Sequence, residues 1–258
     1  MGEQCVERRV RQHADMPKRS RRRGGRGRLT HGRSGRARDL EVQLFEGPEL
    51  GPDMVAPDLD AVLAALEFVD PEAPWKAVRG SVIPLLPRVR PLPVPIDGLI
   101  RTIVPPGIMT GFGMDLGPAV AFVDRHQLQR WDIDVETLTA TALDNVRSIA
   151  ARLDPASIYH GGLDGAPVAV LLSGQGVASA LLLVPDCLER LFGPGPSLLL
   201  APMRDVLMAL PADVERGLAA WLCAEWEALD PNHLHLGGFR QAGGTLTAVP
   251  LEDDIPMA

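Results

Sequence analysis

Two helix-start signals lie ten residues apart near the middle of the chain, and they restrict the fold more than any other feature. Asp124 is followed three residues later by Gln127, the pattern of a capping box in which each side chain bonds the other residue's backbone N–H. Asp134 is a second N-cap candidate, and Ile133 and Leu138 flank it at the spacing of a hydrophobic staple. We therefore expect a short helix after Asp124 and a longer one after Asp134.

The segment after Asp134 carries apolar residues at intervals of three and four, which is the period of one helix face. The pair Asp154-Pro155 ends this helix, because a residue before proline avoids the helical region. A long helix that is apolar on one side is expected to pack across a sheet. The residues of the apolar face are Leu138, Ala142, Val146, Ile149 and Leu153.

Strand-like segments come in neighbouring pairs, with helical segments between the groups. This order favours an α+β fold over a regular βαβ alternation. We expect a single domain with a largely antiparallel mixed sheet and three to four packing helices, preceded by a disordered Arg/Gly-rich tail. The expected strands are 77–86, 99–104, 108–116, 120–123, 156–160, 168–172, 197–201, 206–210, 237–241 and 245–251.

Three further helices are expected outside the central stretch. The first covers 59–68, the second begins near Val177, is renewed at Pro185-Asp186 and runs to Phe192, and the third is capped by Asp213. The third helix should bury a face made of Val214, Leu218, Trp221, Leu222 and Leu229.

Charge divides the chain into two parts with opposite character. Residues 1–40 contain thirteen Lys and Arg against four acidic residues, whereas residues 41–258 contain thirteen against twenty-nine. The Arg- and Gly-rich start has almost no large apolar side chains to bury, so we expect it to be disordered. The expected organisation is a disordered basic tail at 1–45, a linker at 46–58, an α+β domain at 59–251 and a flexible C-terminus at 252–258.

The basic tail is the only part of the chain that we expect to contact nucleic acid. It is either an electrostatic arm, a solvated tail, or an extension produced by a misassigned start codon. No aromatic residue is interleaved with its arginines, which disfavours stacking on bases. The acidic remainder lacks the clustered cations that phosphate binding requires.

Cysteine usage and hydropathy suggest a cytoplasmic protein. Cys5, Cys187 and Cys223 are too few and too scattered for a disulfide framework, which is typical of a reducing compartment. No apolar run approaches the ~20 residues of a transmembrane helix, and arginines stand where a signal peptide would be apolar. We therefore expect no membrane span.

Four blocks, in order, are similar to a known family. They are VIPLLPRVRPLP at 82–93, MDLGPAVAFVDRHQLQRWDIDVETLTATALDNVRSI at 114–149, SGQGVASALLL at 173–183 and LLLAPMRDVLMALP at 198–211. Over roughly 76–211 the chain resembles the YtpQ-like family, bacterial proteins of unknown function. The resemblance implies a bacterial origin and supplies no activity.

Four polar residues are candidates for a binding site. Arg204 and Asp205 occupy a turn, where the charges either position a ligand or bond nearby backbone. Asn145 lies beside the apolar helix face, and its amide either pins a neighbouring loop or lines a pocket. Asp115 ends a strand and is either a general base or a turn residue. We hypothesise that Asn145 and Arg204 approach one cleft, with Asp115 as its weakest member.

Compact catalytic and metal-binding motifs are missing from the sequence. His233 and His235 alternate along an extended segment, so their rings should point to opposite faces, and neither His126 nor His160 lies in a zinc motif. Ser173 lacks the leading glycine of a nucleophile elbow. We expect neither a metal nor a cofactor.

Two function classes remain. The first is a protein-interaction or regulatory module that binds a protein or peptide along a sheet edge or apolar groove. The second is a hydrolase or transferase whose site is assembled from dispersed Asp, Asn, Arg and His residues. The missing motifs favour the first class.

Overall fold

The computed structural model describes residues 70, 72–86, 98–116, 119–163, 165–173, 177–230, 233–234 and 236–251. The tail expected at 1–45, the linker at 46–58, the helix at 59–68 and the C-terminus at 252–258 lie outside these residues. The α+β class is confirmed, and every strand pairing is antiparallel. The described strands form two sheets, where one sheet was expected.

The first sheet is built around one long strand, β3 (Ile108–Asp115). One edge of β3 pairs with β1 (Val82–Leu85). The other edge pairs with β2 (Arg101–Val104) and with β4 (Val120–Phe122), which follow one another along it. Its apolar residues Phe112 and Met114 pack under α4 (Arg125–Trp131) and the first half of α5 (Val135–Arg152).

The second sheet has six strands in the order β10-β9-β7-β8-β6-β5. Neighbours in sequence pair as hairpins, as the sequence indicated, and β7 additionally pairs with β9. Its strands are β5 (Tyr159–Leu163), β6 (Ala166–Leu172), β7 (Ser197–Leu200), β8 (Val206–Pro211), β9 (Gly238–Ala242) and β10 (Thr245–Val249).

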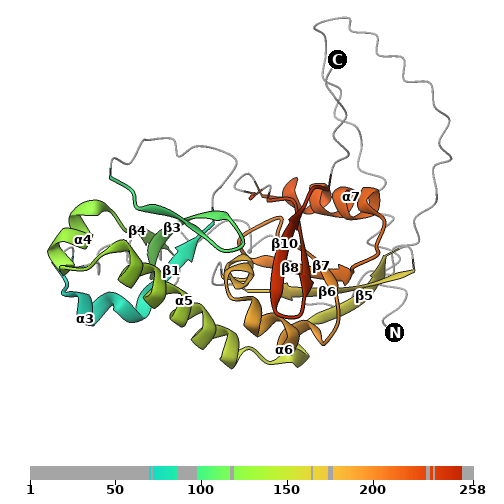
Figure 1. The fold of residues 1–258 in the computed structure, drawn as a ribbon, viewed down its shortest axis with the longest axis horizontal. Helices are drawn as coiled ribbons and strands as arrows, with labels where there is room; N and C mark the ends of the chain where they lie inside the picture. The colour runs from blue at the N-terminus through green and yellow to red at the C-terminus, as the bar shows by residue number, and fades with distance from the viewer. Residues whose placement is uncertain are drawn as a thin grey trace, which may run out of the picture.

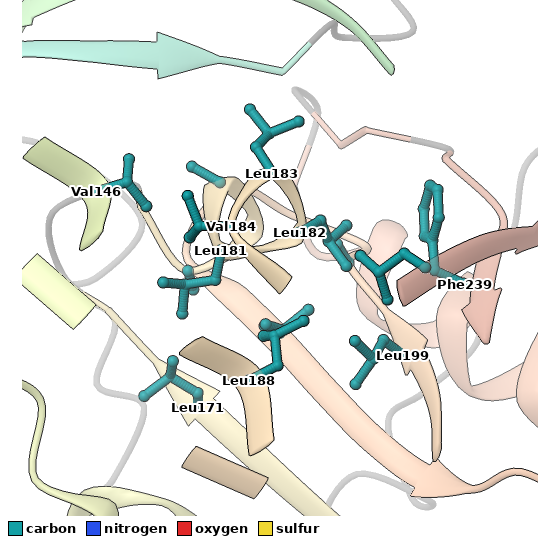
Figure 2. Close-up of a cluster of buried hydrophobic side chains, with 14 of the residues drawn as sticks. Val146, Leu171, Leu181, Leu182, Leu183, Val184, Leu188, Leu199 and Phe239 are labelled. Carbon is teal, nitrogen blue, oxygen red and sulfur yellow. The ribbon is translucent and has the colours of Figure 1, made fainter. Parts of the chain in front are cut away.

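The central strands β7 and β8 are apolar at nearly every position, which suits a sheet covered on both faces. Leu199 contributes to a core with Val146 of α5, Leu188 and Phe239 (Figure 2). Leu198 and Met208 face the opposite side, where α7 (Arg216–Glu227) covers the sheet. Figure 1 shows α7 and α6 (Leu188–Phe192) on opposite sides of these strands.

Helix α5 contributes to the cores of both sheets. Its N-cap Asp134 accepts from the Thr137 N–H at 2.7 Å, and the preceding helix α4 carries the predicted capping box with both bonds formed. Leu138 and Ala142 are buried in the first core, whereas Val146 and Ala150 are buried in the second. The predicted apolar face is therefore divided along its length between two sheets, as α5 crosses from one to the other (Figure 1).

The strand expected at 77–86 is only partly correct. Its first half forms α3 (Trp75–Val78) and the 3₁₀ helix Arg79–Ser81, and only Val82–Leu85 is extended. The Trp75 ring lies 5.2 Å from that of Trp131, and the Ser81 hydroxyl donates to the Val78 carbonyl at 2.8 Å. These contacts hold a compact turn where the apolar pattern suggested a strand.

Two expected helices also differ from the structure. The segment after Val177 restarts at Pro185, as expected, but it forms the 3₁₀ helices Ser179–Leu183 and Pro185–Cys187 before the short helix α6. Helix α7 starts after Glu215 rather than being capped by Asp213. It buries the small residues Ala219 and Cys223, which allow close approach to the sheet, while two residues of the expected face, Trp221 and Leu229, are exposed.

Five α-helices occur in the described part of the chain, of which α3 and α6 have four and five residues. None of the helices in this part combines the length and the apolar character that crossing a bilayer requires.

Leu138→Ala should lower the free energy of unfolding by ~2–5 kcal/mol, because Leu138 is fully buried beneath the first sheet. Thr141→Ala, on a more exposed side of α5, should change it by no more than about 0.5 kcal/mol. Denaturant melts measure both values. Since α5 belongs to both cores, Leu138→Ala should also accelerate hydrogen exchange in β7 and β8; acceleration confined to the first sheet would show that the two sheets unfold separately.

Gly113→Ala should destabilise the protein by ~1–3 kcal/mol, because overfilling a packed site forces neighbours to move. A Cβ on Gly113 would lie 2.8 Å from Leu85 Cδ1 and closer still to Val120 Cγ1. Gly111 is the matched control, since it lies on the same strand and face and its Cβ would meet nothing nearer than 3.7 Å. Equal melting temperatures for Gly113→Ala and Gly111→Ala would contradict this account.

Candidate functional site

Asn145 uses its amide to fasten α5 to the start of the first sheet. Its Nδ2 donates to the Arg79 carbonyl at 2.7 Å and to the Val82 carbonyl at 2.8 Å. Both amide hydrogens are therefore directed at backbone carbonyls that flank the 3₁₀ turn before β1. This arrangement matches the interpretation in which Asn145 pins a neighbouring loop.

Arg204 and Asp205 lie in the turn between β7 and β8, as expected. The Arg204 carbonyl accepts from the Ser179 N–H at 3.1 Å, and the Asp205 carbonyl accepts from the Ser173 N–H at 2.9 Å. The backbone of this turn thus anchors the end of β6 and the start of the buried 3₁₀ helix Ser179–Leu183.

The predicted site residues are divided between the two sheets. Asp115 ends β3 opposite Val120, and Asn145 donates to the carbonyls of Arg79 and Val82 at the start of β1. Both residues therefore contact the first sheet. Arg204 and Asp205 bind segments of the second sheet. The hypothesis that Asn145 and Arg204 share a cleft stays a prediction.

The histidines lie on separate elements. His126 is in α4, His160 is on β5, and His233 follows α7 with its Nδ1 3.0 Å from the Asp230 carbonyl oxygen. His235 lies outside the described residues. No group of three His, Cys, Asp or Glu side chains in the described ranges is arranged to hold a metal ion.

Both described cysteines are free thiols with poor nucleophilic character. Burial, followed by the charge of Glu227, raises the pKa of Cys223 to about 12. Burial and the neighbouring Asp186 also raise the pKa of Cys187. A thiol attacks only as the thiolate, so these environments disfavour cysteine catalysis at neutral pH.

An exposed apolar pair lies on the outer part of the first sheet. Ile103 on β2 is 68% exposed and stands directly opposite Met109 on β3, which is 46% exposed. Large exposed side chains are otherwise found only at Trp221 and Leu229 among the described apolar residues. Strand β2 pairs with β3 alone among the described strands, so no described strand lies along its other edge.

The outer strands of the second sheet have different side chains. The exposed positions of β10 include Thr245 and Thr247, and β5 presents His160 beside two glycines. Proteins ordinarily keep large apolar residues off an open strand edge, because such edges recruit further strands. Strand β1, the other outer strand of the first sheet, is buried at every position, so β2 is the described edge best suited to bind another chain.

Sequence reasoning missed this pair because it searched polar residues for a site. A signal was present nevertheless. The turn at 105–107 separates the strands expected at 99–104 and 108–116, so the register that pairs Ile103 with Met109 follows from a short hairpin.

The chain was compared with family models, with curated proteins and with solved structures, and it has no significant match in any of the three.

Asn145→Asp should destabilise the protein by ~1–3 kcal/mol at neutral pH, because a carboxylate would face the Arg79 and Val82 carbonyls without a proton to donate. Below a pH of about 4 the loss should shrink, since a protonated carboxyl regains one donor. Ser148→Asp, which adds the same charge to an exposed side of α5, is the control. Thermal melts at both pH values give the comparison, and a wild-type melting curve for Asn145→Asp would refute the pinning role.

Proposed function

We propose that this chain is a protein-interaction module that accepts an extended segment of a partner protein as an additional strand along β2. The observation that supports this function is the exposed pair of Ile103 and Met109 on an edge that carries no second strand among the described residues. In an antiparallel pair, alternate residues direct their N–H and C=O groups away from their neighbour. A partner strand would bond to these groups.

Backbone bonds and apolar contacts would have separate roles in such binding. Main-chain hydrogen bonds accept any extended sequence, whereas side-chain contacts select among sequences. Fully burying an Ile or Met side chain is worth ~1.5–3 kcal/mol, and 1.4 kcal/mol corresponds to about tenfold in affinity. Covering two partly exposed side chains would therefore strengthen binding by about a hundredfold, which makes Ile103 the most informative position to change.

The remaining expectations fit this proposal. A partner bound through a backbone edge needs no metal and no cofactor, and free thiols at Cys187 and Cys223 suit a cytoplasmic protein. A bacterial origin stays a prediction that rests on the resemblance of residues 76–211 to the YtpQ-like family. A hydrolase or transferase site is less well supported, because the Asn145 amide is directed at two backbone carbonyls.

The test compares three full-length baits, namely the unmodified chain, Ile103→Lys and Leu229→Lys. Leu229 is 61% exposed and lies after α7, so its substitution removes a similar apolar surface elsewhere. The free energy of unfolding of both variants should lie within about 0.5 kcal/mol of the parent's, because both positions are on the surface. A protein captured from native cells and then rebound in purified form should bind the parent and Leu229→Lys and be lost from Ile103→Lys.

Equal retention of all captured proteins by the three baits would overturn the proposed edge. If the unmodified chain elutes from gel filtration earlier than a monomer and Ile103→Lys elutes as a monomer, the partner strand is instead a second copy of this chain.

A further inference from the structure

We propose that the β2 edge recognises an acidic segment, in which an acidic residue lies two positions from an apolar one, and that Arg101 is the residue that selects the acid. This inference rests on the proposed function and adds the chemistry of the partner. Arg101 and Ile103 are both exposed and, two residues apart on β2, share one face of the sheet.

The surroundings leave the Arg101 guanidinium available. Its cross-strand neighbour on β3 is Gly111, which has no side chain to cover or pair with it. Within the described ranges Arg101 forms no ion pair. A strand added to the free edge of β2 would place its own side chains ~4.5–5.5 Å from those of Arg101 and Ile103, measured between Cβ atoms.

A second arginine lies at the same end of the edge. Arg125 begins α4, and its N–H donates to the Gly98 carbonyl at 2.9 Å, just before β2. Its Cβ is also beside Gly98. The carboxylate of Asp124 at this end accepts from the Gln127 N–H as a helix cap. The charge of Arg125 is offset by the carboxylate of Asp124, so Arg101 supplies the positive charge of β2 itself, whereas Ile103, in the half that approaches the turn at 105–107, is apolar.

This division along β2 defines the sequence pattern expected in the partner segment. An acidic side chain would lie opposite Arg101 and an apolar one opposite Ile103, with one residue between them, because side chains on one face of a strand recur with a period of two. Opposite charges across a strand pair are favourable and like charges are unfavourable. Because the remainder of the chain is acidic overall, this preference must come from local contact and not from net charge.

The experiment titrates isotope-labelled full-length protein with two synthetic peptides, Thr-Ile-Thr-Glu-Thr and Thr-Ile-Thr-Lys-Thr, and follows the amide signals of β2 by NMR. In an added antiparallel strand this order sets the peptide's Ile opposite Ile103 and its Glu or Lys opposite Arg101. The unmodified protein should bind the Glu peptide about fivefold more tightly, the upper end for an exposed ion pair. Arg101→Glu should reverse the preference. Arg216→Glu, which makes the same charge change at the start of α7, should leave it unaltered.

The outcomes separate this inference from the function on which it rests. Equal binding of both peptides, with loss of both on Ile103→Lys, overturns the charge selection and retains the strand-addition edge. A similar shift of preference from Arg216→Glu also overturns it, because the effect would then be one of net charge. Failure of both peptides to bind, or binding that Ile103→Lys leaves unchanged, overturns the proposed function itself.

Discussion

The packing of α5 against both sheets is the constraint on which the rest of the structure depends. The helix has eighteen residues and is therefore about 27 Å long, enough to span two neighbouring cores. Leu138 and Ala142 are buried at one end of the helix and Val146 and Ala150 at the other, so α5 contributes to the cores of both sheets. Asn145 lies between these two sets and donates to the carbonyls of Arg79 and of Val82, the first residue of β1, which fixes the first sheet relative to the helix.

This arrangement explains how an open edge can be tolerated. Strand β2 is held on one side by β3, and the buried residues Val104 and Ile108 fix the end of the hairpin in a core shared with the second sheet. The edge is therefore ordered before any partner arrives. Preorganised surfaces lose little conformational entropy on binding, so even a small apolar pair can contribute usefully to affinity.

Local signals predicted the fold best where side chains bond to nearby backbone. The caps at Asp124 and Asp134 were identified because capping depends on residues three positions away. Residues 179–183 were misassigned as part of a longer helix, since a segment buried on all sides has no polar face to reveal its period. The orientation of α7 was wrong for Trp221 and Leu229, because the small Ala219 and Cys223 determine which face contacts the sheet. The apolar pair of Ile103 on β2 and Met109 on β3 becomes recognisable as a site only when the topology shows which strand is outermost.

The order of strands in the second sheet also has a consequence for the rate of folding. Three of its pairings, β5–β6, β7–β8 and β9–β10, join segments that are adjacent in the chain, and such contacts close small loops. The pairing of β7 with β9 instead spans β8 and the whole of α7. Because closing a larger loop costs more chain entropy, hairpins should form early and the β7–β9 contact late. The two pairings between distant segments, β6–β8 and β7–β9, would then be the last in this sheet to become protected during refolding.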